Sequence, residues 1–555
     1  MKKYLLVLLL ILAAILRLHK ISFFPSGLNA DEAALGYNAY SLLLTGKDEH
    51  GHILPVNLES FGDFKPAGYS YLLIPFVKVF GLTEFAIRLP SALFGVTAVF
   101  LVYMLTKEIF ANLNFENYLR FGIQNLRIEE IVAFMLAISP WHLHFSRGAW
   151  EVNVSTTLLL LGILFFVKWL KNRELISLSL SSLNFVLSMY FYQSTRVIAP
   201  LLGLGLAILY FKTLLKYPKQ IVTNFLLLLL LLAPLILSLA SSDASSRLSG
   251  VGLLADEGPL RRVEQLRGQH SDWNSLLSRL LHNRPVIYVI QFVKNYTDHF
   301  DGNFLFVNGD MIERNRIPET GLFYLTDFIF FALGIYYVLN SKSYKLQATI
   351  WLWLLIAPIA SAMTFQTPNA LRAQNLVIPM TIITSSGLYF FLQLARGSNK
   401  IVFSSLLIIL ITIYIWQFKR YLHQYYVHYP QTYPAAWENG FKELVSYVQS
   451  VQNRYSQIWV TDKYDQPYIL FLFYSQYPPQ KFQDRHQLTF RDKFNFSTVR
   501  DFDKFHFESA PWEKVRDIHS TLIVAAPEDI PSVGVNIVKT FYFPNDQPAF
   551  KIVSN

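Results

Sequence analysis

Two adjacent carboxylates, Asp31 and Glu32, are the first residues of the chain that could carry chemistry. They come shortly after an apolar N-terminal run, and an ionised group at a membrane surface is unfavourable unless it has a task or a partner. A carboxylate there could act as a general base, which contributes about 10²- to 10⁴-fold in rate when well placed. The pair could instead hold a divalent cation through oxygen ligands, or consist of two solvated loop acids.

Lys65 is a lone cation in the same polar segment, at the start of a short apolar stretch. An interfacial lysine often only extends its charge to the lipid headgroups. A phosphate-bearing lipid, however, would need such a cation, and free N–H groups at a helix start would add anion affinity. Arg88, at the start of the next apolar stretch, is expected to be structural.

Residues 139–151 place two histidines, an arginine and an acid between apolar stretches. His142 and His144 could bind a metal, but no third ligand is evident, and no metal site is predicted. Arg147 and Glu151 are four residues apart and could pair on a helix face. In a second interpretation, Glu151 faces a membrane cavity together with Asp31.

Two further arginines, Arg196 and Arg372, stand at the ends of apolar stretches. Each could be an ordinary interfacial anchor. Several cations around one acidic loop would instead suit a phosphate leaving group, because they neutralise its charge.

The composition indicates that lipid surrounds the elements that carry these residues. The 555-residue chain is 53% hydrophobic and only 15% charged, against about 25% charged in a soluble domain. A spanning helix needs about 20 mostly apolar residues. Eleven stretches qualify: 4–18, 86–106, 131–146, 152–170, 176–191, 197–211, 221–240, 322–340, 346–363, 374–395 and 400–417.

The basic residues indicate sidedness rather than nucleic-acid binding. The net charge is +10, but no run of Lys and Arg with interleaved aromatics occurs in the polar segments, so no nucleic-acid partner is predicted. Four short connections are basic and are assigned to the cytoplasm by the positive-inside rule: Lys168 to Arg173, Lys212 to Lys219, Lys342 to Lys345, and Arg396 to Lys400. The chain has no cysteine, so it has no disulfide or thiolate metal site.

Eleven crossings place the N-terminus in the cytoplasm and the C-terminus outside, provided that Pro66 to Phe80 does not cross. That stretch is short and contains Pro75 and Lys78, so we interpret it as a juxtamembrane or re-entrant helix. Tyr4 to Leu16 is interpreted as an uncleaved first span, because no convincing cleavage site follows; a cleaved signal peptide is the alternative.

The predicted organisation is an α-helical polytopic membrane protein with a small C-terminal α/β domain. A transmembrane region, residues 1–420, carries outer loops 21–85 and 241–321. The tail, residues 430–555, combines a helical pattern at 441–451 with strand-like runs at 457–460, 521–525 and 535–542, which is typical of an α/β fold.

In their order along the chain, these motifs resemble the membrane glycosyltransferases of the C superfamily (GT-C), which include protein O-mannosyltransferases, lipid A aminoarabinose transferases and many bacterial and archaeal relatives. One departure is Ala67 after Pro66, where related enzymes often show Lys-Pro-Pro. The matching pieces are Asp31-Glu32, Lys65-Pro66, Gly81 to Glu84, Arg88 to Ala92, Ser139 to Glu151, and Pro368 to Arg372.

The resemblance implies an enzyme of the plasma (inner) membrane that uses a polyprenyl-phosphate sugar at the outer face and inverts the anomeric carbon. By this analogy Asp31 is the general base, assisted by Glu32 or Glu151. Lys65 and Arg372 hold the donor phosphate, with Arg147 and Arg196 as further cations. His299, in the long outer loop, lines the acceptor side. No cofactor is required, although a divalent cation at Asp31 and Glu32 is left open.

Two other classes of protein share some of these features. A transporter or lipid flippase also has many spans, but such folds usually show two related halves with broken helices at matching positions. No internal repeat is visible, and the acids cluster in loops rather than in mid-span. A scaffold that displays the C-terminal domain would need only one or two spans. The sequence therefore favours the glycosyltransferase.

Overall fold

The computed structural model describes residues 2–110, 127–239, 252–340, 344–491, 497–509, 511–531 and 533–554. The beginning of the predicted loop 241–321 and part of the basic connection at Lys342 lie outside these residues. The described chain forms two compact units. We call them the helical unit (Met1–Arg17, Leu93–Ser146 and Glu151–Tyr421) and the loop–sheet unit (Leu18–Ala92, Arg147–Trp150 and Leu422–Asn555).

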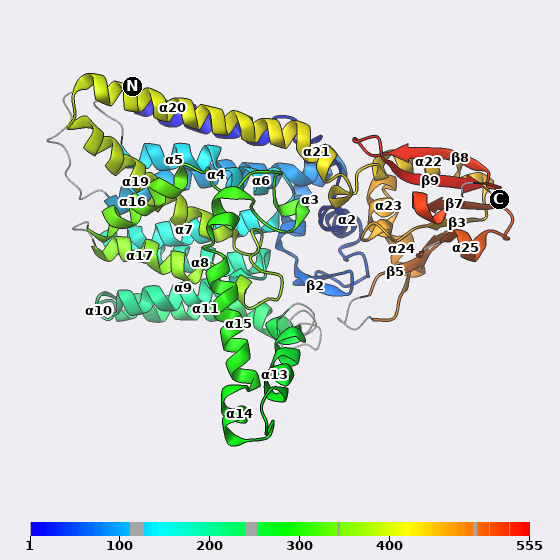
Figure 1. Ribbon diagram of the computed structural model, residues 1–555, viewed down its shortest axis with the longest axis horizontal. Helices are drawn as coiled ribbons and strands as arrows, with labels where there is room; N and C mark the ends of the chain where they lie inside the picture. Colours follow the sequence, from blue (N-terminus) through cyan, green and yellow to red (C-terminus); the bar gives the residue numbers. More distant parts are fainter. Residues whose placement is uncertain are drawn as a thin grey trace. The chain divides into compact units, whose positions relative to one another are not determined.

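Long apolar helices dominate the chain (Figure 1). Among the described residues, five helices are long and apolar enough to cross a membrane: Glu84–Phe110, Glu151–Asn172, Pro218–Ser238, Gln374–Arg396 and Lys400–Thr432. Shorter apolar helices are Tyr4–Leu18, Gly68–Phe80, Leu175–Phe191, Thr195–Leu209, Asp327–Leu339 and Leu346–Ala362. The prediction of a multi-pass helical protein is confirmed, while the count of eleven crossings stays a prediction.

Two of the predicted spans are broken by proline. The stretch 131–146 divides into α5 (Ile128–Ile138) and α6 (Pro140–Phe145), because Pro140 begins a new helix after the cap Ser139. The stretch 346–363 divides in the same way into α17 (Tyr344–Ile356) and α18 (Ile359–Ala362), with Pro358 between them. Proline lacks the N–H that would continue the preceding helix.

Close helix packing in the helical unit depends on glycine. Helices α16 (Asp327–Leu339) and α19 (Val377–Arg396) lie in contact. A Cβ atom at Gly334 would lie 1.9 Å from the carbonyl oxygen of Ile383, and one at Gly387 would lie 1.9 Å from that of Phe330. Small residues allow helix backbones to approach in this way inside a membrane, where packing replaces the hydrophobic effect between helices.

A seven-stranded sheet forms the C-terminal part of the loop–sheet unit, in the order β4-β5-β6-β3-β7-β9-β8. The central strand β3 (Gln457–Val460) runs parallel to β6 (Phe505–Phe507) and β7 (Thr521–Ala525). The other pairs are antiparallel. The edge strands are β4 (Gln487–Leu488) and β8 (Ile537–Tyr542), and β5 (Val499–Phe502) and β9 (Pro548–Ser554) lie next to them.

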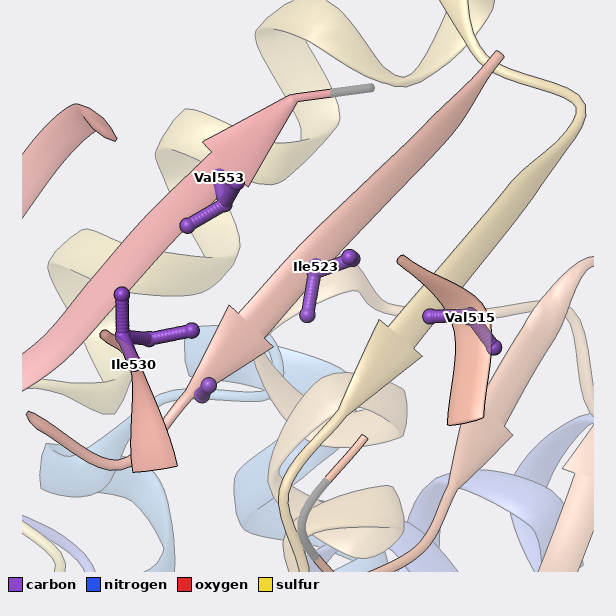
Figure 2. Packing of buried hydrophobic residues seen from close by; sticks show 5 residues of the cluster. Val515, Ile523, Ile530 and Val553 are labelled. Atoms are coloured by element: carbon purple, nitrogen blue, oxygen red, sulfur yellow. The ribbon is translucent and has the colours of Figure 1, made fainter. Parts of the chain in front are cut away.

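The core of this sheet is apolar on both faces. All five residues of β7 are buried, which a strand covered on both sides requires. Figure 2 shows the cluster on one face, where Ile523 packs with Val515, Ile530 and Val553. Helices α22 (Phe441–Val451) and α23 (Pro467–Ser475) contact each other in the same unit. The predicted C-terminal α/β fold is confirmed.

The first loop belongs to the same unit as this sheet. It contains α2 (Ala30–Thr45), the hairpin of β1 (Asn57–Ser60) and β2 (Asp63–Pro66), and α3 (Gly68–Phe80). Helix α2 contacts α23 and α24 (Pro479–Arg485). The 13 residues of α3 extend about 20 Å at 1.5 Å per residue, against the roughly 30 Å of a bilayer core. Its length suits an interfacial helix.

Candidate active site

Helix α2 and the β1–β2 hairpin position Asp31 and Lys65. The side chain of Asn29 caps α2 by accepting the N–H of Glu32 at 3.0 Å, so Asp31 lies in the first helical turn, where the helix dipole favours an acid. In the hairpin, Phe61 and Gly62 both have positive φ, 59° and 68°, which matches a two-residue type I′ turn. Lys65 lies on the second strand, opposite Leu58.

Lys65 forms an ion pair with the carboxylate of Asp31. The Asp31 side chain is 32% exposed and that of Lys65 is 15% exposed. The ammonium group also lies 4.6 Å from the centroid of the Phe61 ring, so the hairpin turn supports the cation that the strand presents. The pair joins a partly exposed carboxylate to a mostly buried cation.

Glu32, the neighbouring acid, is buried and fully committed to other partners. Arg88 on α4 (Glu84–Phe110) donates to its two oxygens at 2.9 and 2.7 Å, and the backbone N–H of Ala149 donates to Oε1 at 2.6 Å. Arg88 is also buried and donates to the carbonyls of Pro25 and Gly27. This geometry favours a structural role for both residues.

Arg147 is likewise buried, in the turn between α6 and α7 (Glu151–Asn172). It donates to the carbonyl of His19 at 2.7 Å and to the hydroxyl of Tyr425 at 3.1 Å, and its guanidinium lies over the rings of Tyr425 and Tyr426. Residues 146–150 are not helical, so Arg147 and Glu151 do not share a helix face as the spacing had suggested. These contacts favour an anchoring role for Arg147.

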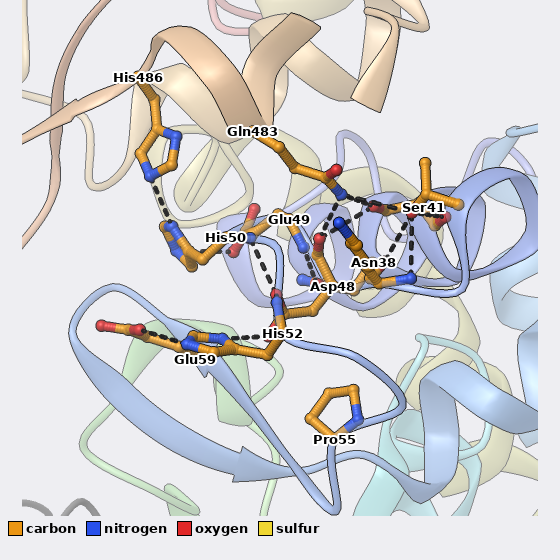
Figure 3. A network of polar contacts seen from close by, with 12 residues as sticks. Asn38, Ser41, Asp48, Glu49, His50, His52, Pro55, Glu59, Gln483 and His486 are labelled. Atoms are coloured by element: carbon orange, nitrogen blue, oxygen red, sulfur yellow. Dashed lines mark hydrogen bonds and ion pairs between the residues drawn. The ribbon is translucent and has the colours of Figure 1, made fainter. Parts of the chain in front are cut away.

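Hydrogen bonds fix the segment after α2 to α24 (Figure 3). The side chain of Gln483 donates to the carbonyl of Asp48 at 2.7 Å and to Ser41 Oγ at 3.1 Å. His50 Nδ1 lies 3.1 Å from His486 Nε2. The carboxylate of Asp48 accepts from the ring and backbone of His52. The loop that carries Asp31 and Lys65 is therefore held by the C-terminal domain.

Glu49 is buried in this segment, and neither of its carboxylate oxygens has a hydrogen-bond partner among the described residues. Burial raises the pKa of Glu49 well above its usual range, and Asp48 and Glu59 raise it further, while Asn38 and Lys65 act in the opposite direction. Burial lowers the pKa of His50 to about 3, with His486 and His52 adding to the effect. Both side chains are therefore favoured in the neutral form.

His299 in the helical unit lies at the centre of a buried network. Its Nδ1 donates to the carbonyl of Asn295 at 2.7 Å, so Nε2 is free to accept from Ser361 Oγ at 2.7 Å and from the N–H of Asn369 at 3.4 Å. Burial lowers the pKa of His299 to about 4, consistent with a neutral ring. The histidine holds the turn that leads to Arg372.

Two more residues hold that turn. Asp310 accepts the N–H of Ala370 at 2.6 Å, and Trp141 donates to the carbonyl of Ala370 at 3.0 Å. Burial raises the pKa of Asp310, while hydrogen bonds and Arg372 act against this shift. No local pattern marked Asp310 in the sequence, because its partner is 60 residues away. In the sequence, Asp310 is visible only as one acid of a predicted outer loop.

The remaining predicted site residues lie in the helical unit. Arg372 donates to Thr364 Oγ1 at 2.7 Å and is partly exposed. Arg196, in the first turn of α9 (Thr195–Leu209), donates to the carbonyl of Met189 at 3.2 Å. Glu151 is the first residue of α7 and is partly exposed. Asp31, Glu32, Lys65 and Arg147 lie in the loop–sheet unit.

The two histidines of α6 form hydrogen bonds with other protein groups. His142 Nδ1 accepts from Arg17 of α1 (Lys2–Leu18) at 2.7 Å, and His144 Nε2 donates to the carbonyl of Arg314 at 2.8 Å. Across the described ranges, no group of three or more His, Asp or Glu residues is arranged to hold a metal ion.

Comparisons with known proteins agree with the motifs. Residues 64–114, which include Lys65 and Arg88, match the model of the family described as dolichyl-phosphate-mannose-protein mannosyltransferase. No curated protein sequence matches the chain. Among solved structures, ArnT from Cupriavidus metallidurans in the apo state is similar, with a TM-score of 0.54 and 9% identity over 99% of this chain and 97% of that chain.

The chain shares the fold of this ArnT. The same ArnT bound to undecaprenyl phosphate gives a TM-score of 0.51 and 8% identity, again over 99% of this chain and 97% of that chain. The resemblance expected from the ordered motifs is thus confirmed at the level of the fold.

The buried ion pair of Arg88 and Glu32 can be tested with a double-mutant cycle. We expect Arg88→Met or Glu32→Met alone to destabilise the protein by about 3–5 kcal/mol, because each leaves an unpaired buried charge. The double variant should lose at least about 2 kcal/mol less than the sum of the two single losses. Thermal unfolding of the purified protein measures the coupling. The exposed pair Arg485–Asp503, 2.7 Å apart, is the control and should show little coupling, because solvent screens exposed ion pairs. Additive losses at Arg88 and Glu32 would contradict the assignment.

The pKa of Glu49 leads to a pH-dependent prediction. The folded pKa lies above the unfolded value, so the folded state binds the proton more tightly, and stability falls as the pH rises through the folded pKa. Glu49→Gln removes this loss. We expect the variant to melt higher than wild type at pH 8, by about 1 °C for each kcal/mol in a chain of this length, with the difference shrinking toward pH 5.

Glu59→Gln is the matched control, because Glu59 lies in the same loop but is ion-paired with Arg491 at 3.5 Å. It should not raise the melting temperature at pH 8. If the difference in melting temperature between Glu49→Gln and wild type were the same at every pH, the pKa of Glu49 would not be raised by burial.

Proposed function

We propose that this chain is a membrane glycosyltransferase that transfers a sugar from a polyprenyl-phosphate-linked donor to an acceptor hydroxyl. The observation that carries the proposal is the ion pair of Asp31 and Lys65, the accessible acid and cation of the first loop. Lys65 lies within the residues that match the mannosyltransferase family model. A base beside a phosphate-binding cation is the minimum that such a transfer needs.

The donor class rests on the shared fold. The structure of ArnT, whose fold this chain shares, has been solved with bound undecaprenyl phosphate. We propose that the donor of this chain carries a lipid phosphate of the same chemical type. Lys65 would contact the phosphate with a partly exposed cation, and a role for Arg372, which lies in the helical unit, stays a prediction. Arg147 would support the loop instead, because its donors are directed at protein carbonyls and at Tyr425.

The proposed reaction is a single displacement at the anomeric carbon. The acceptor oxygen forms a bond to that carbon while the bond from the carbon to the phosphate oxygen breaks, and the electron pair leaves with the phosphate. The acceptor proton goes to Asp31. Attack from the face opposite the leaving group inverts the anomeric carbon. Lys65 would stabilise the negative charge that develops on the phosphate.

The ion pair suggests how donor binding prepares the base. Lys65 has Asp31 as an anionic partner. The donor phosphate is a diester with one negative charge, and it would compete with this carboxylate for the same ammonium group. Release from the ion pair would leave the carboxylate of Asp31 available to take the acceptor proton.

We propose that Asp31 acts as a bare carboxylate without a metal cofactor. A divalent cation shared with Glu32 would need oxygens that Glu32 has already committed to Arg88 and Ala149. A role for Glu151 in assisting the base stays a prediction. It begins α7, in the helical unit, and is partly exposed. His299 would position the turn of Arg372 rather than contact the acceptor. We place the reaction at the outer face of the plasma membrane, on the basis of loop charges.

Asp31→Asn keeps the size of the side chain and removes the base. We expect transfer to fall by about 10²- to 10⁴-fold, with folding close to wild type because Asp31 is exposed. Mass spectrometry of lipid-linked sugars and glycans from cells measures the outcome: a sugar-phosphate lipid accumulates while one glycan loses a residue. The control is Asp503→Asn, an ion-paired aspartate that is 31% exposed. Wild-type glycans in the Asp31→Asn cells would exclude Asp31 as the base.

Lys65→Ala tests the phosphate contact. The variant should raise the KM for the lipid-phosphate donor about tenfold or more, with a smaller change for the acceptor, because the charge it loses faces the phosphate. Steady-state kinetics with the donor and acceptor found by mass spectrometry give the two constants. Lys442→Ala, which removes an exposed ion pair with Glu84, is the control. Equal losses for both substrates would indicate a merely structural lysine.

A further inference from the structure

A helical hairpin in the helical unit exposes an unusual amount of apolar surface. It consists of α13 (Gly258–Gly268), α14 (Leu276–Leu281) and α15 (Arg284–Asp298), and we call residues 258–298 the hairpin. On α15, four aliphatic side chains are 39–62% exposed: Val286, Val289, Ile290 and Val293. Their spacing of three, one and three residues places them on one face of the helix.

The tip of the hairpin continues this surface. Five of its exposed side chains are large and apolar, with exposed fractions of 53–75%: Trp273, Leu276, Leu277, Leu280 and Leu281. An exposed apolar patch outside the spanning helices marks a surface that is covered by a lipid bilayer or by a protein partner.

The charge of the hairpin indicates what covers it. Residues 258–298 contain six basic side chains against three acidic ones. Arg279, Arg284 and Lys294 are exposed and lie on the same helices as the apolar side chains. A helix with an aliphatic face, a tryptophan and flanking arginines is typical of segments that lie in the interface of an anionic bilayer.

The orientation of the hairpin agrees with this occupant. Figure 1 shows α15 running across the common direction of α7, α8 (Leu175–Phe191) and α11 (Pro218–Leu239). Its C-terminal end is fixed to the bundle, because Asn295 donates to the carbonyls of Ala362 and Thr364 at 3.2 and 3.0 Å. A helix that crosses the direction of spanning helices runs parallel to the plane of the bilayer.

We propose that the hairpin is an interfacial anchor that inserts the apolar side chains of α14 and α15 into the headgroup boundary of the membrane. Its arginines bind the phosphates of anionic lipids. The anchor does not depend on the glycosyltransferase activity, and it would hold in a transporter with this fold. It fixes the position of α15, and with it Asn295, whose carbonyl orients His299.

The absence of cysteine from the sequence allows a direct test on the full chain. A single Leu280→Cys variant, labelled with an environment-sensitive fluorophore and reconstituted into nanodiscs, reports the surroundings of α14. Glu264→Cys, at an exposed polar position of α13, is the matched control. We expect lipid-borne nitroxides to quench the Leu280→Cys probe about threefold or more strongly than the control, and aqueous iodide to show the reverse preference.

Lipid charge is tested with the same probe. Nanodiscs of phosphatidylcholine with about one-third phosphatidylglycerol should give stronger lipid quenching than pure phosphatidylcholine, and Arg279→Glu with Arg284→Glu should abolish the difference. Helical circular dichroism and thermal unfolding check that each variant is folded. A Leu280→Cys probe that iodide reaches as readily as the control would overturn the proposal. Burial that appears only with two copies per nanodisc would assign the surface to a second copy instead.

Discussion

The buried ion pair of Arg88 and Glu32 is the interaction on which the first loop depends. Moving two charges out of water costs several kcal/mol per ion, and only complete hydrogen bonding offsets this. Here Arg88 reaches both carboxylate oxygens and also the carbonyls of Ile21, Pro25 and Gly27. One guanidinium therefore fixes the segment before α2 and the start of α2 itself. The backbone of Asp31 has no freedom to move independently.

The fixed helix start separates the roles of two adjacent acids. Neighbouring residues on an α-helix point about 100° apart, so Asp31 and Glu32 face different surroundings. Glu32 is turned into the protein against Arg88, and Asp31 is turned toward the surface and Lys65. The buried acid holds the helix start in place, and the partly exposed acid is the one proposed to react. Rigidity matters because small displacements of a base weaken proton transfer.

Local patterns predicted most of the elements but not the long-range contacts. Apolar runs located most of the spanning helices, and strand-like runs located β3 and β7, because both depend on neighbouring residues. The placement of the first loop against α24 could not be predicted. It depends on Gln483 and His486, which are more than 400 residues away and carry no local signal. The breaks at Ser139 and Pro358 were also missed, because the flanking residues are apolar on both sides.

The same distinction between local patterns and long-range contacts applies to the candidate site. Charge type alone suggested Asp31 and Lys65, and the β1–β2 hairpin brings them together. The same reasoning placed Glu32, Arg147 and His299 at the site, where the structure gives each of them buried protein partners. Sequence shows that a charged residue lies near a membrane surface, but burial and hydrogen bonding decide whether its charge is available to a substrate.

The pairing of Asp31 with Lys65 bears on the proposed roles of both residues. One ammonium group cannot hold the carboxylate of Asp31 and a donor phosphate at full strength at once, because both anions would use the same N–H donors. In the proposed reaction the phosphate would therefore compete with Asp31 for Lys65. The leaving phosphate would gain a second negative charge as its bond to the anomeric carbon breaks, and Lys65 would stabilise that charge most strongly at this point. In this proposal the lysine links the donor phosphate to the base.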